Sequence, residues 1–147
     1  MKIVPCSSTA QEGWLALRQA LWPVGPPAEH LLEMQALLDE PGRFVQYMAY
    51  EADGTPAGFV EAALRTDYVN GTDKSPVAFL EGLYVAPQSR RNGVATLLVA
   101  TIVAWAQAVG CEELAADALL DNEASQAMHR ALGFEETERV VFFRKLI

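Results

Sequence analysis

The sequence predicts one mixed α/β domain that spans residues 1–147. The chain is 51% hydrophobic and 20% charged, which supplies enough apolar side chains for a single core. Segments with the two-residue period of strands alternate with segments that have the longer period of amphipathic helices. No repeat, low-complexity segment or linker divides the chain. The predicted order is β-α-α-β-β-β-α-β-α-β-β, with a central strand–turn–helix–strand unit.

The first third of the chain predicts a short strand and two helices. Lys2 to Pro5 is a short apolar segment typical of an edge strand. Ser8-x-x-Gln11 has the form of a capping box and precedes apolar residues spaced for one helical face. These residues are Trp14, Leu15, Leu17, Leu21 and Trp22. Pro23 to Pro27 breaks this helix, and a second amphipathic helix follows, ended by Pro41-Gly42.

A hairpin and a long polar loop come next. Phe44 to Tyr50 and Ala57 to Leu64 predict two strands, joined by a tight turn at Asp53-Gly54. The loop from Thr66 to Pro76 contains Asn70-Gly71 and is long for a hairpin connection. Such length indicates a functional loop.

The second half continues with a strand that contains a glycine. Val77 to Val85 predicts this strand, and its Gly82 indicates a bulge or a close approach of another backbone. Gly93 to Ala108 predicts a long helix, whose end is marked by Gly110. The remaining predicted elements are a strand at Glu113–Ala118, a helix at Asn122–Leu132, and strands at Phe134–Glu138 and Val140–Lys145.

Charge and composition exclude several classes of protein. With 11 basic and 19 acidic residues the net charge is −8, which disfavours general nucleic-acid binding and favours cationic small molecules. Two cysteines, Cys6 and Cys111, predict buried inert thiols, and no metal-binding constellation is evident. The N-terminus has no signal-peptide pattern, and the longest apolar stretch, Val94 to Val109, is too short for a membrane span. A soluble cytoplasmic protein is expected.

The most specific segment is the turn before the long helix. Gly93 lacks a Cβ, so an anion can approach the free N–H groups and the positive dipole of the helix start. Arg90 and Arg91 add positive charge, and the combination suits a pyrophosphate. An ordinary helix start with two solvated arginines remains an alternative. The patterns of nucleotide triphosphatases and of dinucleotide-binding folds are both absent.

Two motifs carry a family resemblance. Arg90-x-x-Gly93-x-Ala95 after a strand resembles the acetyl-CoA signature of the GCN5-related N-acetyltransferases (GNAT). Asn122-x-x-Ser125-x-x-x-His129-x-x-x-Gly133-Phe134 resembles their second acyl-CoA segment, in which Tyr is usual at the position of His129. The resemblance spans essentially the whole chain and implies a single-domain GNAT fold with a mostly antiparallel central sheet.

Within this family the chain most resembles the aminoglycoside 6′-N-acetyltransferases. The residues that carry this likeness are Leu21-Trp22-Pro23, Asp67-Tyr68-Val69-Asn70-Gly71, Phe79-Leu80-Glu81-Gly82 and Ala131 to Arg139. The likeness implies transfer of acetyl from acetyl-CoA to an amine. The implied cofactor-binding residues are Leu83, Tyr84, Val85, Arg90, Arg91, Asn92, Gly93, Val94, Ala95, Thr96, Asn122, Ser125 and His129.

The reaction requires an acceptor for the proton of the attacking ammonium. A carboxylate can take it directly or through water, and Glu81 in mid-strand is assigned this role. Asp117 is expected beside the acyl-CoA groove, as a second catalytic and substrate-binding carboxylate. His129 stands where the family's acid is usually Tyr, which leaves open whether it protonates the leaving thiolate or only contacts the cofactor.

An aminoglycoside carries several ammonium groups, so its site needs several carboxylates and flat aromatic faces. Trp22, Tyr68 and Glu138 complete the expected substrate site with Glu81 and Asp117. Three alternatives stay open: another small amine or polyamine, a peptide N-terminus, and a noncatalytic acyl-CoA-binding sensor. A homodimer is implied by the resemblance, and the apolar segment Val140 to Phe143 offers an edge for pairing.

Overall fold

A five-stranded sheet forms the centre of the computed structural model, which describes all residues from 1 to 147. Its strands lie in chain order, and every neighbouring pair is antiparallel except β4 and β5, which are parallel. The strands are β1 (Lys2–Pro5), β2 (Phe44–Tyr50), β3 (Pro56–Arg65), β4 (Val77–Val85) and β5 (Leu114–Ala115).

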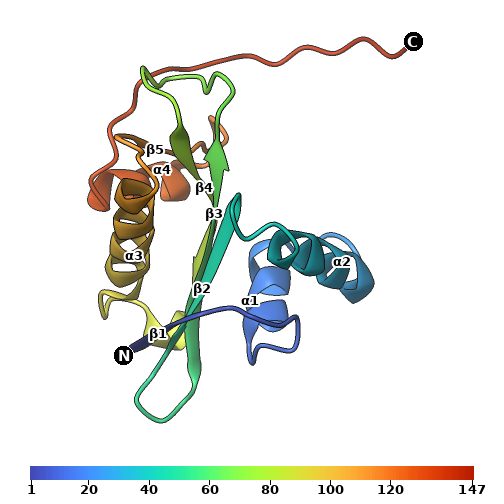
Figure 1. Cartoon of the computed structure of the whole chain (residues 1–147), viewed down its shortest axis with the longest axis vertical. Coiled ribbons are helices and arrows are strands. Elements are labelled where there is room, and N and C mark those ends of the chain that lie inside the picture. The colour runs from blue at the N-terminus through green and yellow to red at the C-terminus, as the bar shows by residue number, and fades with distance from the viewer.

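Helices cover both faces of this sheet (Figure 1). One face carries α1 (Trp14–Leu21) and α2 (Pro27–Leu38), and the other carries α3 (Val94–Ala108) and α4 (Glu123–Ala131). A short 3-10 turn, η1 (Pro87–Ser89), leads from β4 towards α3. The mixed α/β class with a mostly antiparallel sheet is therefore confirmed.

The two faces have separate hydrophobic cores. Fully buried Leu98 and Ile102 of α3 pack on Val60 of β3 in the larger core. On the opposite face, Trp14 of α1 and Met34 of α2 pack on Phe59 of β3 in the smaller one. Because Phe59 and Val60 are adjacent in one strand, their side chains point to opposite faces, and a near-continuous apolar β3 supplies both cores.

Several local predictions match the structure. The bounds of β2 and β4 are as expected, and Gly54 turns the β2–β3 hairpin with a φ of +89°. The capping box at Ser8 is wrong: α1 begins after Gly13, with a φ of +82° and no side-chain cap. A Cβ at Gly13 would lie 2.5 Å from Pro56, so the chain enters the helix through a close approach to β3. The Ser8 hydroxyl accepts instead from the Ala10 N–H at 3.1 Å.

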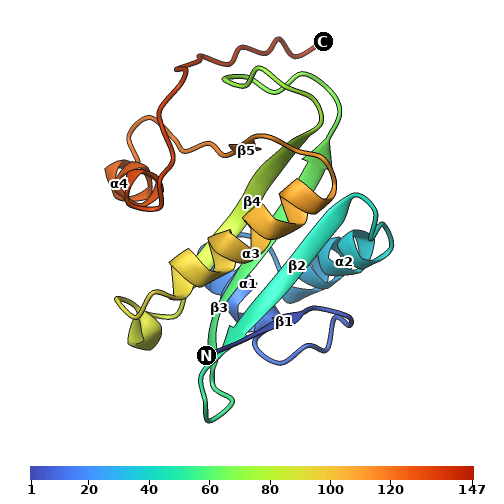
Figure 2. The ribbon, with the colours of Figure 1, turned by 60° about the vertical axis from the view of Figure 1, so that its left-hand side comes forward.

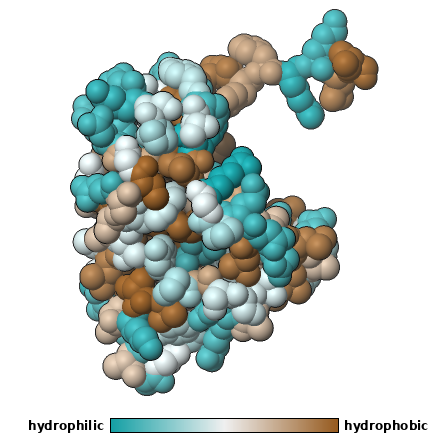
Figure 3. All heavy atoms as spheres, viewed as in Figure 1, coloured by the Kyte–Doolittle hydropathy of each residue, from teal (hydrophilic) through white to brown (hydrophobic).

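The last two predicted strands are absent from this chain, and β5 is shorter than expected. Residues 134–147 form no helix or strand, and their end extends away from the body (Figures 1 and 2). From Val140 onwards the apolar side chains are exposed, with Phe142 at 82% and Phe143 at 91%, and the space-filling view shows this end projecting from the body (Figure 3). A strand needs a partner edge for its backbone groups, which a local apolar pattern does not supply. No helix in the structure has the length and apolar character that crossing a membrane requires.

Candidate functional site

Glu81 occupies a bulge in the middle of β4. The register pairs Glu61 of β3 with Gly82 and Ala62 with Leu80, so Glu81 is the extra residue between them. A bulge re-aims a side chain and bends its strand. It leaves Glu81 exposed between the buried residues Leu80 and Gly82. The bulge predicted from Gly82 is confirmed.

Trp22 lies directly against Gly82. A Cβ at Gly82 would be 2.5 Å from Cη2 of the indole, so only glycine allows this packing. The indole also meets the Phe59 ring edge-on, at a centroid distance of 6.0 Å and an interplanar angle of 70°. The group that approaches Gly82 is therefore a side chain and not the second backbone that this glycine predicts. Trp22 forms a half-buried wall beside the residue that follows Glu81.

Three charged groups act on Glu81. Partial burial raises the pKa of its carboxyl above the ordinary range, Arg65 and Arg43 oppose this rise, and Asp117 adds to it. Asp117 follows the short β5 and is exposed. The structure thus brings Glu81 and Asp117 into electrostatic range of one another. A carboxylate with a raised pKa is a better proton acceptor than an ordinary glutamate.

The sheet opens between β4 and β5. Strand β5 pairs with β4 only through Ala78 and Phe79. On that side no strand accompanies the stretch from Leu83 to Val85, so its backbone groups can bind an extended ligand. Leu83, Tyr84 and Val85 are the strand residues expected to contact the cofactor.

The turn after β4 presents backbone donors. Gly93 has a φ of +75°, and a Cβ there would meet nothing within 4 Å, so the space before α3 is open. No side chain caps α3, which leaves the N–H groups of Val94, Ala95 and Thr96 free for an anion. Asn92 and Arg91 are exposed at the same turn.

Arg90 also has a local role in this turn. Its Nε donates to the carbonyl oxygen of Val85 at 3.0 Å, and its guanidinium lies 5.5 Å from the centre of the Tyr84 ring. These contacts fix the turn and leave the terminal nitrogens of Arg90 available to an anion.

Asn122, Ser125 and His129 come together on α4. The Asn122 side chain caps this helix by accepting from the Ser125 N–H at 3.1 Å. His129 Nδ1 lies 2.6 Å from the carbonyl oxygen of Ser125 and therefore carries a proton that it donates there. In the neutral ring Nε2 is then an acceptor, so only the imidazolium could donate a proton from that atom.

The long loop carries Tyr68 and meets the C-terminal segment. Tyr68 is 73% exposed and borders a hollow of about 300 Å³ in the loop. A Cβ at Gly71 would clash with Oγ1 of Thr137 and lie 3.7 Å from Cβ of Glu138, so the loop and the C-terminal segment touch. The structure therefore brings Glu138 to the loop of Tyr68, while no direct contact joins either residue to Glu81.

Sequence reasoning missed a buried charge network beside Trp22. Arg18 is 3% exposed and forms an ion pair with Glu61, which is 2% exposed. His30 is buried as well. Two signals were available: Arg18 lies midway between Trp14 and Trp22 on the apolar helical face, and Glu61 interrupts an apolar strand.

Comparison with known proteins gives consistent matches. Residues 12–134 match the model of the acetyltransferase (GNAT) family. Aminoglycoside N(6′)-acetyltransferase type 1 from Acinetobacter genomosp. 13 is 52% identical, with 100% of this chain and 99% of that protein aligned. The Serratia marcescens protein of the same name is 51% identical, with 99% of each covered.

Solved structures agree over the full chain. The crystal structure of aminoglycoside antibiotic 6′-N-acetyltransferase AAC(6′)-IG from Acinetobacter haemolyticus has a TM-score of 0.94 and 50% identity, over 100% of this chain and 99% of that one. AAC(6′)-Iy in complex with the bisubstrate analogue CoA-S-monomethyl-acetylneamine has a TM-score of 0.91 and 44% identity, over 99% and 98% of the two chains.

Proposed function

Since this chain belongs to the acetyltransferase (GNAT) family, we propose that it transfers acetyl from acetyl-CoA to the 6′-amine of aminoglycoside antibiotics and so confers resistance. The observation that carries the proposal is the β4 bulge, which presents Glu81 beside the wall formed by Trp22. The near full-length likeness to aminoglycoside 6′-N-acetyltransferases supports the acceptor.

The chain has a suitable place for coenzyme A. The free N–H groups at the start of α3, with Arg90 and Arg91, suit its pyrophosphate, and the open space at Gly93 fits this group. The unpaired edge from Leu83 to Val85 suits its amides. When bound, acetyl-CoA supplies the activated acetyl thioester.

In the proposed mechanism Glu81 orients the acceptor amine and receives its proton, directly or through water. Its raised pKa suits this task, and the negative charge of Asp117 adds to the attraction for an ammonium group. Backbone N–H groups near Leu83 stabilise the charge that develops on the thioester oxygen. Asn122 and Ser125 orient the N-terminal turn of α4, and His129 borders the leaving group without a required acid role.

The rest of the acceptor is bound by acidic and aromatic groups. Trp22 offers an indole face, Tyr68 an exposed phenol, and Glu138 a carboxylate at the same loop. Aromatic faces attract ammonium groups and stack on sugar rings. The net charge of −8 increases the rate at which a polycation is captured.

The proposal is tested by measuring thiol release from acetyl-CoA with a panel of amines. The panel contains aminoglycosides with a 6′-amine, matched compounds with a 6′-hydroxyl, polyamines and short peptides. Release with the 6′-amine compounds alone is expected. Release only with polyamines or peptides would overturn the acceptor assignment, and binding of acetyl-CoA without any release would indicate a sensor.

We also propose that the protein is a cytoplasmic homodimer. Both cysteines are free and buried, as is usual in a reducing compartment, and burial raises the pKa of the Cys6 thiol to about 12.

The apolar side chains between Val140 and Ile147 are exposed to solvent. The same segment of a second copy can bury these side chains and can pair with the backbone groups of this segment. Light scattering should give twice the chain mass, and Phe143→Glu should shift it towards the monomer. A monomeric wild-type protein would contradict the dimer.

A further inference from the structure

The position of Trp22 is not determined by its helix. Trp22 follows the last residue of α1, and its backbone is hydrogen-bonded to that helix only through its N–H, which donates to the carbonyl oxygen of Arg18 at 2.8 Å. Its φ and ψ of −122° and 80° are not helical. The indole nevertheless reaches across to Gly82. Other contacts must therefore hold it on the bulge.

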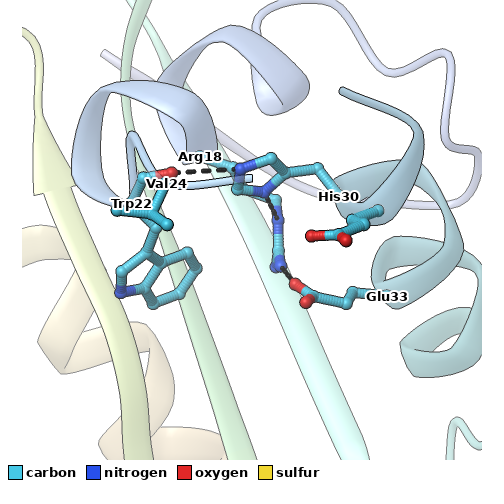
Figure 4. A pocket seen from close by; sticks show the side chains of 6 residues that line it. Arg18, Trp22, Val24, His30 and Glu33 are labelled. Atoms are coloured by element: carbon cyan, nitrogen blue, oxygen red, sulfur yellow. Dashed lines mark hydrogen bonds and ion pairs between the residues drawn. The ribbon is translucent and has the colours of Figure 1, made fainter. Parts of the chain in front are cut away.

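The Phe59 ring supplies one of these contacts, and His30 and Arg18 supply the polar ones. His30 Nε2 lies 3.1 Å from the Trp22 carbonyl oxygen, so Nε2 carries the proton and donates. Nδ1 of the same ring is then free to accept, and Arg18 Nε donates to it over 3.4 Å. The Arg18 guanidinium also lies 4.9 Å from the centre of the Trp22 ring. Figure 4 shows the sequence of contacts from the Trp22 carbonyl through His30 and Arg18 to Glu33.

Arg18 is in turn held by the strand opposite the bulge. Glu61 of β3 accepts from Arg18 with both carboxylate oxygens. Glu61 is also the register partner of Gly82, on which the indole lies. The contacts therefore close a ring from Glu61 through Arg18 and Trp22 to Gly82 and back to Glu61. Because Glu81 is the bulged residue beside Gly82, any movement within this ring changes the direction of its carboxylate.

We infer that Arg18, His30 and Glu61 are positioning residues for the acetyl acceptor: they hold the Trp22 indole on Gly82 and thereby fix the bulge that presents Glu81. The inference rests on the proposed function for its catalytic consequence. None of the three side chains needs to touch the acceptor. Arg18 and Glu61 neutralise one another in the interior, whereas His30 joins them to the Trp22 backbone. His30 is thus the member whose removal tests the positioning with the least effect on folding.

The test compares His30→Ala with His30→Gln. Gln can restore an N–H donor near the position of Nε2, whereas Ala cannot. Gln35→Ala, at an exposed residue of the same helix, is the matched control. The first readout is the indole N–H signal of Trp22 in a ¹H–¹⁵N spectrum, assigned with Trp22→Phe. It should shift or broaden in His30→Ala and return towards the wild-type position in His30→Gln. An unchanged signal in His30→Ala overturns the inference whether or not the protein is an acetyltransferase.

The second readout is steady-state kinetics. In His30→Ala, kcat/KM for a 6′-amino aminoglycoside should fall about tenfold. Displacement of the Trp22 indole disturbs the geometry from which the acceptor amine attacks the thioester. KM for acetyl-CoA should stay within about twofold, since the turn before α3 is untouched. Gly82→Ala, which pushes the indole from the other side, should give the same pattern. Proportional losses for both substrates would show general structural damage and overturn the inference. Inactivity of the wild-type protein would instead refute the proposed function.

Discussion

Replacing Arg18 by Met should destabilise the protein severely. The change keeps the apolar length of the side chain but removes the guanidinium that pairs with Glu61, which is 2% exposed. Removing one partner of a buried ion pair costs about 3–5 kcal/mol, because the remaining carboxyl must be buried either charged without a partner or protonated. A chain of 147 residues has an unfolding entropy of about 0.3 kcal/mol/K, so a loss of about 4 kcal/mol lowers Tm by about 13 °C.

The loss should also depend on pH. Burial raises the pKa of Glu61 to about 7, and Arg18 opposes a further rise. Without Arg18 this pKa moves higher. Above pH 7 Glu61 is then protonated in the folded variant. It is deprotonated in the unfolded variant and in both the folded and the unfolded wild type. The stability deficit of the variant should therefore grow by about 1.4 kcal/mol per pH unit above pH 7, up to its new pKa.

Thermal and urea unfolding of four proteins at pH 6, 7 and 8 measure both effects. The proteins are the wild type, Arg18→Met, Glu61→Met and the double variant, which form a double-mutant cycle. The double variant should be more stable than Arg18→Met, because no charge is left buried without a partner. A double variant that loses the sum of the single losses, or an Arg18→Met protein that melts within about 3 °C of the wild type, would refute the reasoning.

Three further predictions concern the site. Glu81→Gln should lower kcat about 10²-fold or more with little change in KM for acetyl-CoA. Because partial burial raises the pKa of Glu81, the acidic limb of the wild-type kcat/KM profile should lie above the ordinary glutamate range and be lost in the variant; a limb that persists would remove Glu81 from the mechanism. Arg90→Ala with Arg91→Ala should weaken acetyl-CoA binding measured by calorimetry, and unchanged affinity would argue against the phosphate turn. His129→Ala should lower kcat less than about tenfold, because Nδ1 is engaged by the Ser125 carbonyl; a loss above 10²-fold would identify a general acid.

Local sequence patterns are sufficient to predict most of the helices and strands. The apolar stretches that became β2 and β4 have the predicted bounds, since strand period and turn residues act over a few neighbouring positions. The same holds for Gly93, whose positive φ and open surroundings agree with its expected place at the start of α3. Gly82 predicted a bulge or a close approach of another backbone; the bulge is present, but the group that approaches Gly82 is the side chain of Trp22.

Features that depend on distant partners were not available from local patterns. The segments predicted as strands after Phe134 are apolar enough for a sheet, but a strand also requires a free edge, and this chain does not pair them. The charge network joins Arg18 of α1, His30 of α2 and Glu61 of β3, which are separated by up to 43 positions. No periodicity links such residues, because their contact exists only after both helices have packed on the sheet.

Composition, motif order and periodicity therefore predict the fold class, the acidic character and the turn proposed to bind an anion, since each follows from overall composition or from residues close together in the chain. The tertiary structure decides how the site is presented. It pairs Glu61 with Gly82 across two strands, places the Trp22 indole where a Cβ would stand, and leaves Glu81 as the unpaired residue of the bulge. The physical reason is that burial of Arg18 and Glu61 becomes favourable only when folding brings opposite charges together, away from water.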